Sequence, residues 1–203
     1  MSLYRYDFAQ GYQGWQPGFA DFAPGEIGNY QFGHGWREVP PPAGTGRGLY
    51  ISSMNRSDDV FMFHKLRLAG LEPNHNYKAV FKVALASKYV SAPGIGGDPA
   101  LSVYLKACAS TQDPQYIIAD GALRLDIDIG AQASAGKNSV VLGTIDKPVD
   151  GTEEYRIIER QSSKPLPCRS DELGGVWILF GTDSGYEGET QLYYTYFEAA
   201  FVT

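Results

Sequence analysis

Short stretches of alternating apolar and polar residues run through most of this chain. From Tyr77 to Leu85 the odd positions are aromatic or aliphatic, and lysines occupy two of the even positions between them. From Leu123 to Ile129 the odd positions are again apolar, and charged residues lie between them. A period of two places every second side chain on the same face of a β-strand. Both stretches are therefore predicted to be strands with one buried face.

The same pattern predicts ten to twelve strands in all, separated by turns rich in glycine and proline. The others fall near residues 4–8, 49–54, 60–68, 103–108, 140–145, 155–160, 176–180 and 192–202. No segment shows a sustained helical period, although Ser170–Leu173 fits one helical turn. Many short strands with turns between them are typical of a sandwich or barrel. This number of strands fits a jelly roll better than a seven-strand immunoglobulin fold.

The last thirty residues are predicted to form the closing element of the fold. A buried strand, Val176–Phe180, is followed by a glycine-rich acidic loop, Gly181–Thr190, and by an aromatic strand, Leu192–Val202. We interpret them as a large β-hairpin that closes the sandwich. Within residues 60–68 the apolar positions change from odd to even near His64, which predicts a β-bulge there.

Composition and strand number together support an all-β, single-domain jelly-roll sandwich over residues 1–203. Hydrophobic residues make up 43% of the 203 residues and charged residues 20%, which is enough apolar surface for a core. The net charge is -6 with no basic block, which argues against nucleic acid and anionic membranes as partners. No apolar run of about 20 residues is present, so no transmembrane segment is expected.

The location of the protein and the state of its cysteines are open at this point. The opening residues 1–3 are consistent with a cloning scar on a chain trimmed of its export signal. We expect a secreted, periplasmic or cell-surface protein, with a cytoplasmic location as the alternative. Cys108 and Cys168 either form one disulfide or are both free, and their spacing does not suggest a zinc site.

Several spaced motifs together resemble a family of bacterial proteins of unknown function. The motifs are residues 15–21, 56–63, 70–77, 94–107 and 180–194, so the resemblance covers most of the chain. Members of that family look like galactose-binding-type jelly rolls, similar to carbohydrate-binding modules. Such modules often hold a structural calcium ion with an aspartate in the last strand. Thr195 stands at that position here, which weakens the case for that particular calcium site.

The acidic loop near the end of the chain is a candidate metal or sugar site. It contains Asp183, Glu187 and Glu189 among glycines. Calcium takes six to eight oxygen ligands, and glycine-rich loops expose backbone carbonyls. Asp183 and Glu187 are therefore candidate ligands of a structural calcium ion. The alternative is an ordinary turn in which Asp183 hydrogen-bonds its own backbone.

Aromatic residues near the beginning of the chain are candidates for stacking on sugar rings. Trp15, Phe19, Tyr30 and Trp36 lie in glycine-rich sequence that is predicted to form loops, where binding residues are common. The alternative is that these rings fill the core, because large aromatic side chains dominate core energetics.

Two charged groups are weaker candidates. Arg56, Asp58 and Asp59, near His64, could bind a polar ligand or support acid–base chemistry, or they could form a solvated turn. Asp126 and Asp128 lie two residues apart on one predicted strand face beside Arg124, about 7 Å apart by strand geometry. That separation lies between those of retaining and inverting glycosidase pairs, although a solvated strand face gives the same pattern.

These observations predict a non-catalytic binding module of a secreted or cell-surface bacterial protein, with carbohydrate as its ligand. The alternatives are an enzyme acting on polysaccharide, a hydrolase or a lyase, and a structural or protein–protein interaction domain. The predicted ligand contacts are Trp15, Tyr30, Trp36, Arg56, Asp58 and Asp183.

Overall fold

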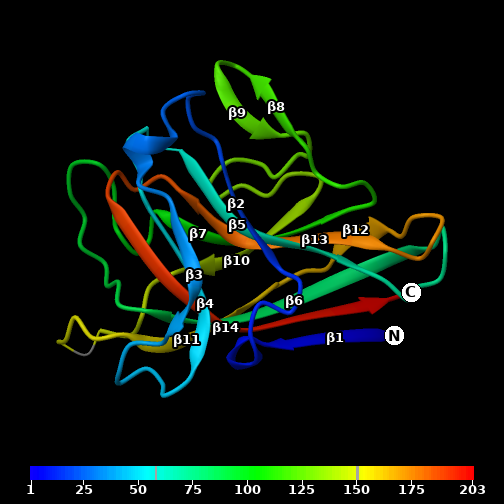
Figure 1. Cartoon of the computed structure of the whole chain (residues 1–203), viewed down its shortest axis with the longest axis horizontal. Coiled ribbons are helices and arrows are strands. Elements are labelled where there is room, and N and C mark those ends of the chain that lie inside the picture. Colours follow the sequence, from blue (N-terminus) through cyan, green and yellow to red (C-terminus); the bar gives the residue numbers. More distant parts are fainter. Residues whose placement is uncertain (58, 150) are drawn as a thin grey trace.

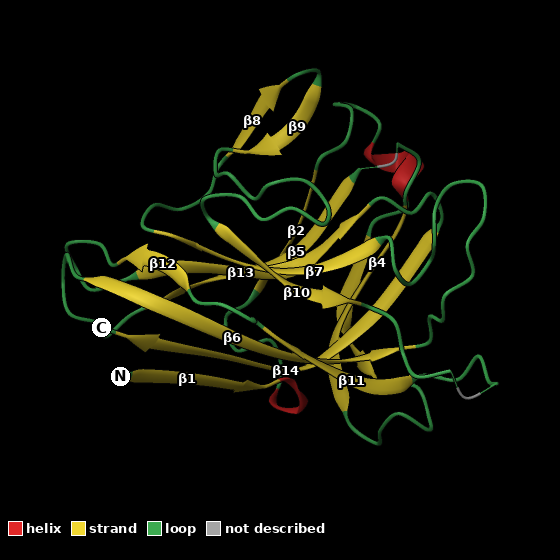
Figure 2. Ribbon diagram, turned by 180° about the vertical axis from the view of Figure 1, so that it is seen from behind, coloured by secondary structure: helices red, strands yellow, loops and turns green. Residues whose placement is uncertain are grey.

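The computed structural model describes residues 1–57, 59–149 and 151–203, and these residues form two stacked antiparallel sheets (Figures 1 and 2). The larger sheet has the order β11-β6-β14-β4-β3, with β1 on β14 and β12 on β6; the smaller has the order β10-β7-β13-β5-β2. The larger sheet contains β1 (Ser2–Asp7), β3 (Gly33–Glu38), β4 (Arg47–Met54), β6 (Asn76–Ser87), β11 (Arg156–Gln161), β12 (Leu166–Arg169) and β14 (Glu189–Val202). The smaller contains β2 (Gln16–Ala20), β5 (Val60–Leu68), β7 (Val103–Ser110), β10 (Ser139–Thr144) and β13 (Val176–Ser184). A separate hairpin, β8 (Tyr116–Ala119) and β9 (Ala122–Leu125), and two 3₁₀-helices, η1 (Phe8–Gln10) and η2 (Ile27–Tyr30), complete the fold.

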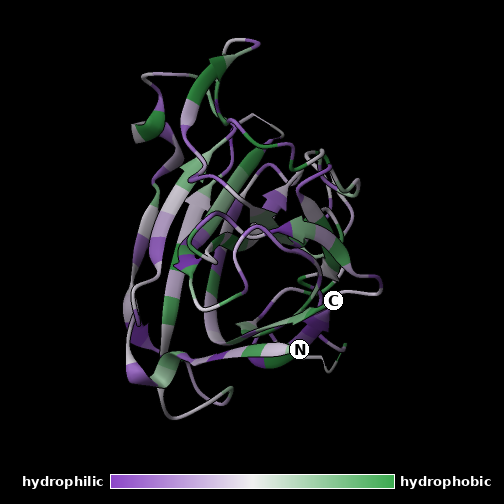
Figure 3. Ribbon diagram, turned by 90° about the vertical axis from the view of Figure 1, so that its right-hand side faces the viewer, coloured by the Kyte–Doolittle hydropathy of each residue, from purple (hydrophilic) through white to green (hydrophobic). Residues whose placement is uncertain are grey.

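The strands from β4 to β7 alternate between the two sheets, as they do in a jelly roll. Hydrophobic and hydrophilic residues alternate along the strands (Figure 3), so each sheet turns one apolar face toward the other. The predicted all-β sandwich is confirmed. None of the helices in the described part of the chain is long and apolar enough to cross a membrane.

Stacked and edge-on aromatic rings fill the centre of the sandwich. The ring centroid of Phe180 lies 4.7 Å from that of Trp15 and 4.6 Å from that of Phe197. All three side chains are at most 2% exposed. Burying a large apolar side chain contributes roughly 1.5–3 kcal/mol, so this cluster holds the two sheets together.

The predicted C-terminal hairpin is wrong. β13 pairs with β5 and β7 in the smaller sheet, whereas β14 pairs with β1, β4 and β6 in the larger one. Residues 185–188 therefore carry the chain from one sheet to the other, and the loop is shorter than predicted because β13 continues to Ser184. Both strands are central in their sheets. Their apolar faces meet across the core, where the ring of Phe180 lies 4.9 Å from that of Tyr194.

The predicted bulge in β5 is also wrong. β5 pairs with β13 in unbroken register from Val60 to Leu68. The apolar positions change phase because the first half of β5 is covered on both faces. Met62 belongs to the core between the sheets, while Phe61 and Phe63 pack in a second cluster on the outer face. Leu125 and Ile129 cover that second cluster, although the strand predicted over 123–129 ends at Leu125.

Candidate functional site

A row of outward-facing residues crosses the larger sheet and carries two tyrosines side by side. Tyr193 on β14 lies opposite Tyr50 on β4 and opposite Ala86 on β6. Tyr50 in turn lies opposite Gly35 on β3. The neighbouring residue Leu192 is fully buried in the core, and strand alternation therefore turns Tyr193 to the outside. Small residues flank the two rings on both sides.

A third tyrosine and two cations complete this surface, which we call the tyrosine face: Tyr50, Tyr155, Tyr193, Arg37 and Lys88. The ring of Tyr193 lies 5.0 Å from that of Tyr50 and 5.4 Å from that of Tyr155, the latter at an interplanar angle of 89°. The guanidinium carbon of Arg37 lies 3.9 Å from the centroid of the Tyr50 ring, and Lys88 Nζ lies 5.6 Å from that of Tyr155. Cations at these distances are attracted to the ring faces.

The three phenol groups of the tyrosine face lie close together and, among the described residues, have no protein hydrogen-bond partner. Burial is the main reason why the pKa of Tyr193 is raised, and the nearby Tyr50 raises it further. Burial is also the main reason why the pKa of Tyr155 is raised, and the nearby Tyr193, Tyr50 and Glu189 raise it further. Within residues 1–57, 59–149 and 151–203, none of the three hydroxyls hydrogen-bonds to another protein group. Hydroxyls that meet at a surface without partners can donate to, and accept from, a bound ligand.

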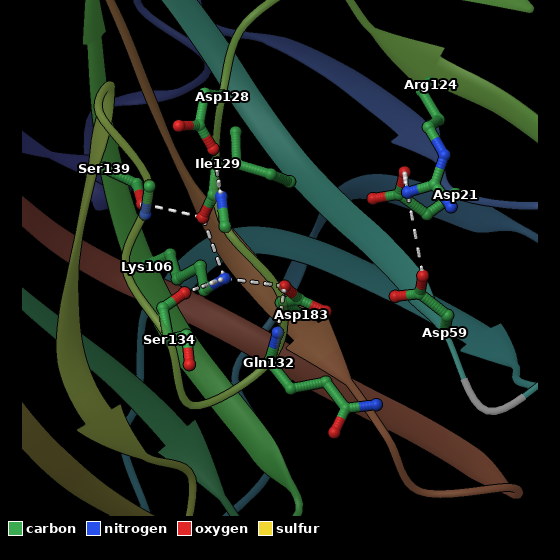
Figure 4. A network of polar contacts seen from close by, with 12 residues as sticks. Asp21, Asp59, Lys106, Arg124, Asp128, Ile129, Gln132, Ser134, Ser139 and Asp183 are labelled. Carbon is green, nitrogen blue, oxygen red and sulfur yellow. Dashed lines mark hydrogen bonds and ion pairs between the residues drawn. The ribbon is translucent and has the colours of Figure 1, made fainter. Parts of the chain in front are cut away.

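A second group of polar residues lies on the outer face of the smaller sheet and is buried (Figure 4). Lys106 Nζ on β7 lies 2.7 Å from Asp183 Oδ2 on β13, and the two side chains are 0% and 1% exposed. The same ammonium donates to the carbonyl oxygens of Ile129 at 2.9 Å and Ser134 at 3.1 Å. Its three N–H groups thus meet three oxygens. The backbone N–H of Gln132 donates to Asp183 Oδ2 at 2.8 Å.

These contacts fasten the loop of residues 126–138 to the sheet. Within the loop, Asp128 accepts hydrogen bonds from the backbone N–H groups of Gly130 and Lys137 at 3.0 and 2.9 Å. These bonds lower the pKa of Asp128. Asp126 accepts from the backbone N–H of Gln115 at 2.9 Å. Asp126 and Asp128 therefore do not share one strand face, because β9 ends at Leu125, Asp126 binds the backbone of Gln115, and Asp128 caps the turn at Gly130.

Beside this loop, Asp21 and Arg124 form a partly exposed charged group (Figure 4). Arg124 Nη1 lies 3.4 Å from Asp21 Oδ1 and 3.9 Å from Asp59 Oδ2. Asp21 is 8% exposed. Burial, with repulsion from Asp59 and Asp183, raises the pKa of Asp21 to about 7. A carboxyl group with such a pKa can exchange a proton near neutral pH, as general acids and bases do, although structural ion pairs give similar shifts.

Two of the three aromatic residues predicted to stack on a ligand lie inside the protein. Trp15 is 2% exposed, and its ring contacts include Phe180 and Phe197. Tyr30 is 1% exposed. Trp36 is partly buried; its indole N–H donates to the carbonyl of Phe8 at 2.7 Å, and the Arg47 guanidinium lies 4.5 Å from its ring. The rings of Trp15 and Tyr30 fill the core, as the alternative interpretation held.

The predicted polar contacts are spread over separate places. Arg56 is exposed and lines a depression of about 420 Å³ with Gly28, Asn29 and Gln31. Asp58 lies outside the described residues. His64 is buried between the rings of Phe180 and Tyr194, so it does not converge with Arg56. The predicted cluster around Arg56 is therefore not brought together with a histidine.

The acidic loop predicted to bind calcium is divided between strand and loop. Asp183 is a residue of β13 and is paired with Lys106, whereas Glu187 is exposed and its backbone N–H donates to Gly96 O at 2.7 Å. Thr195 Oγ1 donates to Ala84 O at 3.2 Å. No cluster of three or more histidine, cysteine or acidic side chains suited to a metal is found in the part of the chain that the structure describes.

Both cysteines are free thiols in this structure. Cys108 is fully buried, and burial raises its pKa to about 12. Cys168 is partly exposed, and burial raises its pKa to about 11. Thiols with such pKa values are mostly protonated at neutral pH and react slowly.

The sequence pattern did not single out the tyrosine face. Tyr50 and Tyr193 are neighbours only because β4 and β14 pair, and these strands are far apart in sequence. Lys106 was also missed, because it occupies a polar position in an alternating strand. The one local signal is the run of aromatic residues in β14, where an alternating strand presents every second ring to solvent.

No family model matches the chain, and no curated protein matches it. Several solved structures are similar to it over nearly their whole length. The K1 cleaved adhesin domain of Lys-gingipain from Porphyromonas gingivalis is 16% identical, with 98% of each chain covered and a TM-score of 0.46. The carbohydrate-binding module TmCBM61, solved with β-1,4-galactotriose, is 10% identical, with 96% of this chain and 93% of that chain covered and a TM-score of 0.43. A cyclase from Fischerella sp. TAU is 11% identical, with 98% of each chain covered and a TM-score of 0.42. These similarities concern overall architecture and identify no ligand and no site residues.

Proposed function

We propose that this protein is a non-catalytic carbohydrate-binding module and that the tyrosine face is its contact surface. The observation that carries the proposal is the set of three tyrosine hydroxyls that hydrogen-bond to no protein group among the described residues. They lie on one sheet face between a guanidinium and an ammonium group. A sugar presents both an apolar C–H face and a dense set of hydroxyls, and this surface offers a counterpart to each.

The geometry assigns different parts to the three rings. Tyr50 is 6% exposed and carries Arg37 on its face, so its ring supports the guanidinium rather than a ligand. Tyr155 and Tyr193 are partly exposed and stand at 89° to each other. One of these two rings can stack on a sugar while the other borders it. Burial of aromatic surface against a ligand and hydrogen bonds from the phenol groups then act together.

Groups around the two exposed rings supply the polar contacts. The side chain of Gln191 donates from Nε2 to Glu189 Oε1 at 2.8 Å, which fixes an amide and a carboxylate beside the tyrosines. Arg37 and Lys88 add hydrogen-bond donors at either side. Carbohydrate as the ligand class implies a secreted, periplasmic or cell-surface protein, and we include that location in the proposal.

A glycan-binding experiment with matched tyrosine variants tests this proposal. The protein is screened against a glycan panel, and the best ligand is titrated with wild type, Tyr155→Ala and Tyr193→Ala. We expect each variant to bind at least ~10-fold more weakly, because each loses a ring contact and a hydroxyl. Tyr116→Ala is the control, since Tyr116 is 48% exposed on β8 and does not belong to the tyrosine face. Absence of binding to every glycan, or equal binding by all variants, would contradict the proposal.

A polysaccharide-acting enzyme is the second candidate, favoured by Asp21. Its carboxyl has a pKa raised to about 7 and lies 3.4 Å from Arg124 Nη1, and the Asp59 carboxylate lies 3.9 Å from the same atom. A carboxyl group whose pKa lies near neutrality can act as a general acid or base in hydrolysis. Release of reducing ends from a polysaccharide by wild type but not by Asp21→Asn would support this candidate. Equal release, or none, would leave Asp21 with a structural role only.

A further inference from the structure

A cleft of about 640 Å³ opens between the two sheets at the end of the sandwich where β6 begins. One wall is formed by Asn76 and Tyr77 of β6 and by Cys168 and Arg169 of β12, which pairs with them. The other wall is formed by the end of β7 and the residues that follow it. The hydroxyl of Thr111 donates to Arg169 O at 2.8 Å and joins the two walls. The strand pairing and this hydrogen bond therefore hold the walls of the cleft in place.

The residues that line this cleft include two cations and no carboxylate. Lys137 and Arg169 are both exposed and line it from different segments. In the described ranges neither side chain forms an ion pair within 4 Å. The carboxylate of Asp128 lies near Lys137, but its two oxygens already accept backbone N–H groups from Gly130 and Lys137 itself. In a chain of net charge -6 this is a local excess of positive charge.

Neutral polar groups lie beside the two cations. Asn138 is held in place, since its side chain donates to Ala109 O and accepts from Asp128 N. The side chains of Asn76 and Gln112 are exposed, and within residues 1–57, 59–149 and 151–203 they hydrogen-bond to no other protein group. Each amide can both donate and accept. The ring of Tyr77, which is 6% exposed, adds an apolar surface to the wall formed by β6.

We propose that this cleft binds a small sugar acid. The carboxylate pairs with the Arg169 guanidinium and the Lys137 ammonium, and the hydroxyls hydrogen-bond to Asn76 and Gln112. A guanidinium binds a carboxylate through two parallel hydrogen bonds, and such charge-assisted bonds are the strong ones. The volume lies within the range of about 300–1,000 Å³ that is usual for small-molecule sites.

This site is separate from the tyrosine face and does not rest on the function proposed for it. Asn76 begins β6, and Ala86, which lies beside Tyr193, comes ten residues later on the same strand. At about 3.3 Å per residue these positions are about 33 Å apart. A small ligand therefore contacts one surface or the other, and each can be tested alone.

The reactivity of the Cys168 thiol can be used to measure whether the cleft holds a ligand. It lines the cleft and is partly exposed, whereas Cys108 is fully buried. Alkylation by iodoacetamide in the folded protein, at a mildly alkaline pH where more of the thiol is ionised, should therefore occur at Cys168 rather than at Cys108, and intact mass spectrometry gives its rate. The rate is measured with glucuronate, with glucose as the neutral counterpart, and with inorganic phosphate as an anion without hydroxyls on carbon. Direct binding of glucuronate is measured by calorimetry in parallel.

We expect saturating glucuronate to slow alkylation of Cys168 at least ~5-fold and glucose to leave it unchanged. Arg169→Gln should weaken glucuronate binding at least ~10-fold, because it removes a charge-assisted pair. Lys164→Gln is the matched control, since it makes the same change of charge at an exposed position outside the cleft.

Three results would overturn the proposal. The first is the absence of protection and of calorimetric binding at tens of millimolar glucuronate. The second is equal protection by glucose, which would remove the role of the carboxylate. The third is protection by phosphate alone, which would show an anion site without sugar recognition. The folding of Arg169→Gln is checked by its melting temperature, and Lys137→Gln gives a second, independent removal of positive charge.

Discussion

Replacing Lys106 by methionine tests whether the buried ion pair fastens the 126–138 loop to the smaller sheet. Methionine keeps a long, unbranched side chain but removes the ammonium. Among the described residues, Asp183, which is 1% exposed, then keeps the Gln132 backbone N–H as its one donor to Oδ2. The carbonyl oxygens of Ile129 and Ser134 lose the donor that they share. The substitution thus leaves an uncompensated carboxylate and takes the ammonium donor from both carbonyls, of which Ile129 O keeps the Ser139 hydroxyl as a donor.

The expected cost follows from these losses. Removing one partner of a buried ion pair destabilises a protein by about 3–5 kcal/mol, because the remaining charge stays buried. For a domain of this size each kcal/mol lowers the melting temperature by about 2–4 °C, so we expect a fall of roughly 6–20 °C. The double variant Lys106→Met/Asp183→Leu removes both charges and leaves only neutral groups unpaired. It should therefore lose less than the sum of the two single variants.

Denaturant unfolding and calorimetry measure the loss, and the buried thiol of Cys108 shows where it occurs. Cys108 belongs to the outer apolar cluster that Ile129 helps to cover. If the loop detaches before global unfolding, Cys108 of Lys106→Met becomes reactive under native conditions. Lys164→Met is the control for loss of an exposed lysine. A cost below about 1 kcal/mol, with Cys108 still protected, would refute the fastening role of the pair.

The remaining predictions concern pH and packing. Burial raises the pKa of Asp21 to about 7, so between about pH 4 and 7 the folded protein holds a proton that the unfolded chain releases. Its stability contribution falls as pH rises through that window, by at most roughly 1.4 kcal/mol per pH unit, and Asp21→Asn should abolish this slope in pH-dependent denaturation. Burial lowers the pKa of His64 to about 3, so between about pH 6.5 and 3 the unfolded chain binds the extra proton. The contribution of His64 therefore falls as pH decreases, and His64→Phe should remove that opposite slope; unchanged slopes in the two variants would contradict both assignments. A Cβ at Gly181 would lie 1.9 Å from Met62 O and 2.7 Å from Phe63 Cα, whereas one at Gly28 would meet no atom within 4 Å. Gly181→Ala should cost about 1–3 kcal/mol or more and Gly28→Ala about 0.5 kcal/mol or less, as read from denaturant midpoints, and equal costs would contradict this packing.

The sequence predicted the strands well and their partners poorly. The alternation from Tyr77 to Leu85 correctly identified β6, because a half-buried strand has a local signature. β13 and β14 were misread as a hairpin because two apolar strands joined by a glycine-rich loop look alike whether they pair or cross to opposite sheets. The pairing of strands depends on contacts between residues that are far apart in the sequence, and the local pattern does not show these contacts.

The same limit explains the candidate residues. A tryptophan such as Trp15 can serve either in a binding surface or in the core. The packing of Phe180 and Phe197 around its ring shows that Trp15 belongs to the core. Asp183 was expected in an acidic loop, but its burial depends on Lys106 from a neighbouring strand. The sequence shows which residue types are present, but which of their side chains reach solvent depends on packing between strands that are distant in the sequence.

If the tyrosine face and the cleft are two separate binding sites, a substitution in one should not affect binding at the other. The tyrosine face and the cleft lie toward opposite ends of β6, about 33 Å apart by strand geometry. Sites this distant without shared partners act independently within about 0.5 kcal/mol. Tyr193→Ala should therefore leave the protection of Cys168 by glucuronate unchanged, and Arg169→Gln should leave glycan binding at the tyrosine face unchanged. If Tyr193→Ala abolished both, the two surfaces would form one site, and the assignment of a separate ligand to each of them would be wrong.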